Sequence, residues 1–235
     1  MDDIWQASLT AATMLATMDA DLVEIILLSL RVSLTAVLIA ALVGMPLGAL
    51  LALQRFPGRR VVIVTLNALM GLPPVVVGLL VYLLFSRAGP FGVFGLLFTP
   101  TAMIIAQVIL VLPIIASLTR EILETLSQEY DEALRSLAAS ARQALLALLW
   151  DGRFMLMTAL LAGFGRAVAE VGAVMIVGGN IDHVTRVMTT AIALEASKGN
   201  LSVALGLGMV LLLLSLIVNA AAYAIRLMGE TRHAT

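Results

Sequence analysis

Long apolar segments, separated by short charged stretches, dominate this chain of 235 residues. A helix that crosses a bilayer needs about 20 largely apolar residues, and five segments are long enough. They are residues 25–53, 61–85, 96–118, 154–177 and 203–225. All are too long for strands, and a transmembrane barrel would show shorter segments of alternating hydrophobicity. The pattern therefore predicts an all-α integral membrane protein with five transmembrane helices.

Proline and glycine interrupt this apolar pattern at three places. Pro46 stands in "GMPLG" within the overlong first span, where it removes a backbone donor and favours a tilt or bend. Pro73 and Pro74 in "GLPPVVVG" should break the second span, either as a packing kink or as unwound backbone that lines a pore. The run Gly178, Gly179 and Asn180 predicts a helix C-cap and turn, with a gate role for Asn180 as the second interpretation.

Composition supports a membrane protein and excludes several other classes. The chain is 61% hydrophobic and only 12% charged, whereas globular domains carry about 25% charged residues. The net charge is −1 without a basic block, so we expect no nucleic-acid partner. There is no cysteine, and neither a metal-ligand set nor a nucleophile–base arrangement stands out. Lys198 is the only lysine and lies in "SKGN", so the chain has no P-loop for ATP.

The arginines and the single lysine predict the orientation, because cytoplasmic loops are enriched in cations. One side of the membrane receives nine of the 14 cations: Arg55, Arg59, Arg60, Arg120, Arg135, Arg142, Arg153, Arg226 and Arg232. The other side receives Arg87, Arg186 and Lys198, while Arg31 and Arg166 lie inside spans. We therefore expect an extracytoplasmic surface segment at 1–20, a transmembrane domain at 21–228 and a cytoplasmic tail at 229–235.

Residues 128–153 form a charged stretch between two apolar spans, on the side predicted to be cytoplasmic. Strong helix formers dominate it. Apolar residues recur at helical spacing and predict one apolar face: Leu134, Leu137, Ala138, Ala141, Leu145 and Leu148. Such a face has to be buried, either beneath the membrane core or in a groove on a soluble partner.

The stretch "DEALRSLAAS" resembles the EAA loop of ABC importer permeases, whose pattern is Glu-Ala-Ala, three residues, then Gly. Glu132 and Ala133 match, Leu134 replaces the second Ala, and Ala138 stands at the Gly position. The resemblance implies a coupling helix that docks on an ATPase through Glu132, Ala133, Leu134, Leu137, Ala138, Ala139 and Ser140. An ordinary interfacial helix is the alternative.

Further stretches are similar to the molybdate- and tungstate-type permeases of this family. They are "GMPLGALLALQRFPGRR", "GLPPVVVGLLVYLLFSRAGPFG" and "GFGRAVAEVGAVMIVGGNI", while Trp150 and Asp151 depart from the usual Leu-Pro that follows the loop. The resemblance runs from about residue 21 to residue 223. It implies a homodimeric pore in the bacterial inner membrane, without a bound cofactor and without enzymatic activity of its own. Two ATPase subunits would carry ATP and Mg, and an extracytoplasmic protein would bind the oxyanion.

The expected function is thus the permease subunit of an importer for a tetrahedral oxyanion, with tungstate preferred and molybdate or sulfate as alternatives. A secondary transporter or channel that needs no ATPase would leave the cytoplasmic motif unexplained. A membrane anchor would leave the charges within the spans unexplained. Co-purification with an ATPase separates these classes.

Two charged residues of the fourth span, Arg166 and Glu170, are four residues apart and should share a helix face. Charges inside a membrane are costly and face a partner or a cavity. The pair is either a structural ion pair or part of the translocation path, in which Arg166 helps an anion to pass. Arg31 lies near the outer end of its span, where snorkelling towards the interface is expected.

Overall fold

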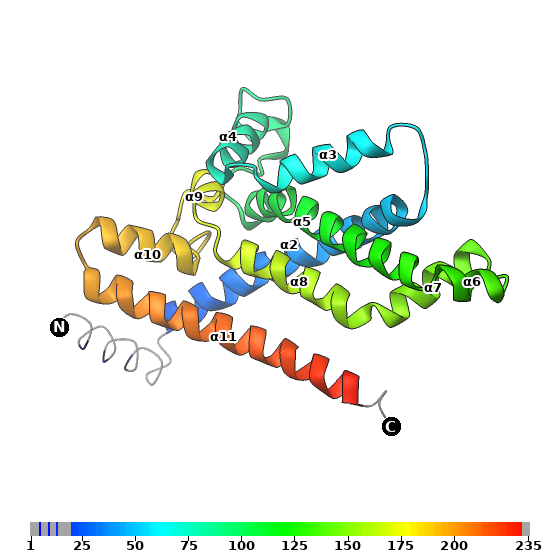
Figure 1. Cartoon of the computed structure of the whole chain (residues 1–235). Helices are drawn as coiled ribbons and strands as arrows, with labels where there is room; N and C mark the ends of the chain where they lie inside the picture. The colour runs from blue at the N-terminus through cyan, green and yellow to red at the C-terminus, as the bar shows by residue number, and fades with distance from the viewer. Residues whose placement is uncertain (1–4, 6–8, 10–12, 14–19, 232–235) are drawn as a thin grey trace. The chain divides into compact units, whose positions relative to one another are not determined.

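The computed structural model describes Trp5, Leu9, Thr13 and residues 20–231. The predicted surface segment at 1–20 lies almost entirely outside the described residues, and so does the end of the tail at 232–235. Every regular element in the described part is a helix (Figure 1). In chain order they are α2 Ala20–Leu53, α3 Arg59–Met70, α4 Pro74–Phe85, the 3₁₀ turn η1 Gly92–Phe94, α5 Pro100–Glu129, α6 Asp131–Ser136, α7 Ala141–Asp151, α8 Arg153–Val168, α9 Gly172–Gly178, α10 Met188–Ser197 and α11 Leu201–Thr231.

Three helices are long and apolar enough to cross a membrane by themselves: α2, α5 and the 201–221 part of α11. Two interrupted pairs, α3 with α4 and α7 with α8, also qualify if each pair counts as one span. The described residues therefore hold three to five candidate spans, and the predicted all-α membrane architecture is confirmed. Helix α2 continues through Pro46 without interruption.

The break predicted in the second span is present. Helix α3 ends at Met70 and α4 begins at Pro74. Pro73 is the extended N-cap of α4, with φ −65° and ψ 122°. Pro74 takes the first helical position, where its missing N–H costs nothing because that group has no partner inside a helix.

Two predictions about helix continuity were wrong. Residues 154–177 do not form one helix, because α8 ends at Val168 and α9 begins at Gly172. The charged stretch 128–153 is likewise not one helix: α6 and α7 are separated by a turn at 137–140. Side-chain hydrogen bonds at both interruptions supply the physical reason, as described below.

The chain divides into two compact units, the first comprising residues 1–36, 73–107 and 165–220. Within it, α10 lies beside the beginning of α11 (Figure 1). The core at this place consists of Leu22 from α2, Met188 and Ala191 from α10, and Leu207 and Val210 from α11. The backbone N–H of Met188 also donates to the Ser29 hydroxyl at 2.8 Å, which ties the start of α10 to α2.

The second unit comprises residues 37–72, 108–164 and 221–235. Here α2 and α5 pack closely through small residues. A Cβ atom at Gly48 would lie 2.5 Å from the Ala116 carbonyl oxygen, and one at Gly44 would lie 3.2 Å from that of Leu112. The spacing of four residues places both glycines on one helix face, as in many helix pairs within membranes. The "GMPLG" stretch therefore serves close helix packing.

Candidate functional site

The turn between α6 and α7 lies in the second unit and contains the position where glycine is usual. The N–H of Ala138 donates to Arg135 O, and that of Ala139 to Leu134 O, both at 3.0 Å. Ala138 has φ +49°, in the left-handed region. These features define a Schellman motif, in which glycine is preferred because it has no Cβ. The left-handed conformation thus explains why glycine is usual at this position of the family pattern, and this chain adopts the same conformation with alanine.

The same turn is fixed on its other side by Ser140, the N-cap of α7. The Ser140 hydroxyl accepts from the Gln143 N–H at 3.4 Å, and Gln143 Oε1 accepts from the Ser140 N–H at 2.9 Å. This reciprocal pair is a capping box. Together the two motifs end α6 and start α7, so the predicted single helix is replaced by two.

The predicted apolar stripe is divided by this turn. Leu148 is buried against Leu123 and Leu126 of α5, and Leu134 and Leu145 pack against that cluster. The other predicted members remain exposed: Leu137, Ala138 and Ala141.

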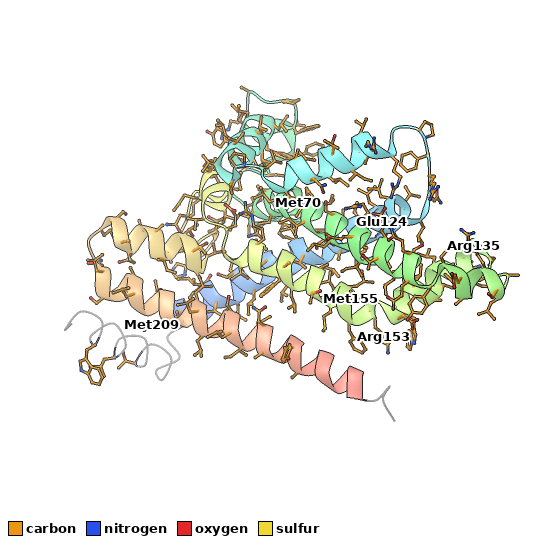
Figure 2. The ribbon with its side chains drawn as sticks, viewed as in Figure 1. Met70, Glu124, Arg135, Arg153, Met155 and Met209 are labelled. Atoms are coloured by element: carbon orange, nitrogen blue, oxygen red, sulfur yellow. The ribbon has the colours of Figure 1, made fainter. Side chains whose placement is uncertain are left out.

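What remains exposed forms an apolar surface with polar edges. Leu137 is 78% exposed and Trp150 is 65% exposed, although both are large apolar side chains. We use the name α6–α7 surface for seven of the exposed residues of α6, the turn and α7: Glu132, Ala133, Leu137, Ala138, Ser140, Leu146 and Trp150. Of the predicted coupling residues, only Leu134 and Ala139 are partly buried. Figure 2 shows Arg135, which pairs with Asp131 at 2.9 Å, projecting from α6.

The chain bends sharply after Trp150 and Asp151, which stand where the family usually has Leu-Pro. Helix α7 ends at Asp151, and the axis of α8 is bent by 68° from that of α7. The intervening Gly152 packs so tightly that a Cβ atom there would lie 2.7 Å from a Leu126 methyl group. The Arg153 guanidinium lies 4.5 Å from the ring centre of Trp150. Glycine and close packing thus produce a bend at the place where the family uses proline.

An ion-pair cluster that we did not predict also lies in the second unit. Glu124, labelled in Figure 2, accepts from Arg59 Nη2 at 3.0 Å and pairs with Arg120. Arg59 Nε also donates to the Leu51 carbonyl at the end of α2, at 2.6 Å. The cluster therefore fixes the loop between α2 and α3 against α5. The spacing of Arg120 and Glu124 could have indicated their pairing, whereas no sequence signal joins Arg59 to residues 61 and 65 positions away.

The break between α8 and α9 lies in the first unit and is built around Glu170. This side chain is only 5% exposed. Its Oε1 atom accepts from the Ala173 N–H at 3.0 Å, which satisfies a free donor at the start of α9. Its backbone carbonyl accepts from the Thr189 hydroxyl at 2.9 Å. Glu170 therefore stabilises an interruption in the apolar segment.

Gln107 of α5 completes this arrangement. Its Nε2 atom donates to the Ala167 carbonyl, in the last turn of α8, at 3.0 Å. Both Gln107 and Thr189 are buried, and they line a small cavity together with Glu170 and two serines. Backbone groups freed inside a membrane have to find partners within the protein. Here neighbouring helices supply those partners, which explains why a long apolar segment is not one helix.

Arg166 and Glu170 are brought together, as the spacing predicted. The Nη2 atom of Arg166 lies 3.8 Å from Oε2 of Glu170, and 36% of the Arg166 side chain is exposed. The separation exceeds a hydrogen-bonding distance, so the shorter contact of the carboxylate is with α9. Glu170 thus has a structural role, while the guanidinium of Arg166 keeps an exposed surface.

Helices α4 and α9 lie side by side in the first unit (Figure 1). A Cβ atom at Gly78 would lie 2.7 Å from the Ala173 Cα atom, and one at Gly172 would lie 2.8 Å from a Val75 methyl group. The second contact joins the first turns of both helices. The predicted pathway residues Pro73, Pro74 and Glu170 lie at or just before the starts of α4 and α9 and are therefore brought close together.

Asn180 lies at the other end of α9. Gly179 and Asn180 have φ +70° and +51°, so the predicted C-cap and turn are confirmed. The Thr185 hydroxyl donates to the Gly178 carbonyl at 2.6 Å and accepts from the Ile181 N–H at 2.9 Å. These bonds close the turn. Asn180 is thus separated from the other pathway candidates by the length of α9.

Comparison with known proteins identifies the group to which this architecture belongs. Residues 44–226 match the family described as binding-protein-dependent transport system inner membrane component. The chain belongs to this family of ABC permeases. The permease is therefore a multi-pass inner membrane component that works with an ATPase and a binding protein, and it is not itself an enzyme. Membership of this family contradicts the two alternative functions, an ATPase-independent transporter and a membrane anchor.

Relatives of the permease include named anion, tungstate and sulfate permeases. It is 43% identical over 204 residues to a probable anion ABC transporter permease of Haloferax volcanii, covering 85% of this chain and 88% of the relative. It is 40% identical over 226 residues to a tungstate uptake system permease of Peptoclostridium acidaminophilum, covering 96% and 99%. A sulfate transport permease of Synechocystis is 29% identical over 204 residues, covering 79% and 72%.

Proposed function

We propose that this permease imports a tetrahedral oxyanion, with tungstate as the preferred substrate. The observation that carries the proposal is the similarity to a tungstate uptake permease over nearly the full length of both chains. The named sulfate permease is less similar. Molybdate and sulfate remain the alternatives within the family.

The proposed assembly is a homodimer with two ATPase subunits that carry ATP and Mg and one extracytoplasmic binding protein. The cation distribution supports an extracytoplasmic N-terminus and a cytoplasmic α6–α7 surface. Uptake of radiolabelled tungstate, molybdate and sulfate by vesicles that hold the complete transporter tests the function. We expect tungstate uptake that requires ATP and is inhibited least by sulfate. Equal transport of all three anions, or uptake without ATP, would contradict the proposal.

The α6–α7 surface is the proposed docking site for the ATPase. Leu137 and Trp150 expose apolar area on the side predicted to be cytoplasmic, and a partner groove would remove that area from water. The Schellman turn and the capping box hold this surface in one conformation before any partner binds. Low conformational freedom reduces the entropic cost of docking.

Leu137→Asp and Ala138→Arg test the docking proposal, because each introduces a charge that would be buried unpaired in the partner groove. Both positions are exposed, so the permease should still reach the membrane. We expect loss of the ATPase on purification and loss of uptake in both variants. Arg55→Asp, an equally exposed change at the end of α2, serves as the control and should keep the ATPase. Normal ATPase recovery in both test variants would refute docking at this surface.

The proposed translocation path passes the break between α8 and α9. Arg166 is partly exposed and lies 3.8 Å from its carboxylate partner, so part of its positive potential is available to an anion. A doubly charged anion in a low-dielectric pore needs such potential, and a dimer would present two copies. Pro73 and Pro74 belong to the same proposed path, because α4 and α9 begin next to each other.

A double variant separates the pathway role from a structural ion pair. Arg166→Gln should lower uptake while assembly survives, and Glu170→Gln should be milder because an amide oxygen can still accept from the Ala173 N–H. A structural pair predicts that the double variant recovers uptake, since no unpaired charge remains. The pathway role predicts that it stays defective. Full recovery at matched protein level would exclude the pathway role.

A further inference from the structure

One face of the first three turns of α2 lines an open cavity of about 720 Å³ in the first unit. Residues at spacings of three and four share a helix face, and this face combines apolar and charged side chains. Its members are Ala20, Val23, Glu24, Leu27, Leu28 and Arg31. Pro100, His183 and Val184 complete the lining.

Arg31 has no ion-pair partner in the described part of the chain. It is the twelfth residue of α2, a candidate membrane span, and arginine is well suited to bind phosphate. Charged residues within membrane segments usually face a partner, a cavity or the interface. Arg31 is exposed, so its guanidinium is available to an anionic group from outside the described chain.

The lining of the cavity decides between a free anion and a lipid. Glu24 stands two turns before Arg31 on the same face, and its side chain remains 46% exposed although it binds His183 at 2.8 Å. A free dianion would be repelled by this carboxylate and would find no polar partners on Leu27 or Val184. A phospholipid uses all of these groups, because it joins a phosphate, a cationic end and apolar chains.

The geometry of the helix fits such a headgroup. Side chains on a helix tilt towards its N-terminus, so Arg31 extends towards Glu24. Their Cα atoms are about 10 Å apart along the axis at 1.5 Å per residue, and the long arginine side chain shortens the distance between the charges. Leu27 and Leu28 lie between the two charged residues, beside the short linker of the headgroup, whereas the acyl chains would continue past Arg31 along the exposed Leu34 and Leu38.

We propose that this cavity binds a zwitterionic phospholipid, with the phosphate on Arg31, the ammonium group on Glu24 and the acyl chains beyond Arg31, along Leu34 and Leu38. The inference is independent of which anion the permease transports. Arginine suits this role because its planar fork donates two parallel hydrogen bonds to phosphate.

Native mass spectrometry of the intact transporter in detergent tests the site, with phosphatidylethanolamine, phosphatidylglycerol and diacylglycerol added separately. We expect phosphatidylethanolamine to bind best and diacylglycerol to bind least. Arg31→Gln should lower occupancy about tenfold or more, since a charge-assisted contact is lost. Arg31→Lys should retain more binding than Arg31→Gln. Glu24→Gln should remove the preference for phosphatidylethanolamine over phosphatidylglycerol.

Arg87→Gln is the control, because Arg87 is an exposed arginine that lines a different cavity. Unchanged lipid binding in Arg31→Gln, or equal loss in Arg87→Gln, would overturn the proposal. Displacement of the lipid by millimolar sulfate would instead assign the cavity to free anions. A change in subunit number in Arg31→Gln would show that Arg31 contacts a second copy. If Arg31→Gln fails to assemble, Arg31→Lys and Glu24→Gln still decide the question.

Discussion

Replacing Ala138 with glycine should stabilise the turn between α6 and α7. Ala138 has φ +49°, a conformation that costs an L-residue about 1–2 kcal/mol and costs glycine nothing. Glycine loses more entropy on folding, which offsets about 0.4–1 kcal/mol of this gain. The net effect should be about 0.5–1 kcal/mol in favour of the closed turn.

Hydrogen exchange at the Ala139 amide measures this change, because its N–H donates to Leu134 O across the turn. A local stabilisation of about 0.5–1 kcal/mol should slow exchange about two- to fivefold, since 1.36 kcal/mol corresponds to tenfold. The residue at position 138 is exposed, so no packing is lost in the variant. Uptake should persist because the usual family residue is restored.

Ala133→Gly provides a matched control with the opposite expected sign. Ala133 is also exposed but lies within α6, where glycine is about 0.8–1 kcal/mol less favourable than alanine. Exchange at the Ala139 amide should therefore become roughly fivefold faster. Equal directions of change in the two variants would refute the assignment of a left-handed turn at Ala138.

Three further changes test the first unit. Glu170→Ala should lower the yield of folded permease, because it leaves a buried backbone donor unsatisfied at a cost of about 1–3 kcal/mol, whereas Glu170→Gln should keep the yield near wild type. Gly78→Ala should lower the melting temperature, since its Cβ would lie 2.7 Å from a backbone atom of α9, while Gly165→Ala has open space and should be neutral. The hydrogen bond to Glu24, aided by neighbouring acidic residues, raises the pKa of His183 above 6.5. The stabilisation of the folded state by the His183–Glu24 pair should thus be complete below about pH 6.5. It should disappear as the pH rises through the higher pKa that His183 has in the folded state. The melting temperatures of wild type and His183→Asn should therefore differ at acidic pH and converge at alkaline pH, and a constant difference would contradict this assignment.

Hydropathy and local helix signals in the sequence were sufficient to predict most of the helical architecture. Spans such as α2 and α5 follow from the length of their apolar runs, because only a helix satisfies the backbone of such a run within a membrane. The break at Pro73 follows from proline chemistry alone. The turn at Ser140 also had a local signal, the Ser-x-x-Gln capping box, although the helical periodicity across it suggested continuity.

The break between α8 and α9 could not be predicted in the same way. The segment is apolar on both sides of Glu170, and the spacing of Arg166 and Glu170 suits an unbroken helix. The interruption is stabilised by Gln107, 60 residues before its partner Ala167, and by Thr189, 19 residues after Glu170. Periodicity within one segment contains no information about donors and acceptors on other helices.

The interruptions before α4 and before α9 therefore depend on different physics, although these two helices begin side by side. Pro73 and Pro74 have no N–H to satisfy, so the break before α4 is determined by the chain itself. The break before α9 leaves polar backbone groups that the side chains of Glu170, Gln107 and Thr189 help to satisfy. Its conformation can therefore change when neighbouring helices move, whereas the proline break cannot close. Under the proposed pathway role of Arg166, such an interruption would convert movement of the neighbouring helices into a local change at this residue.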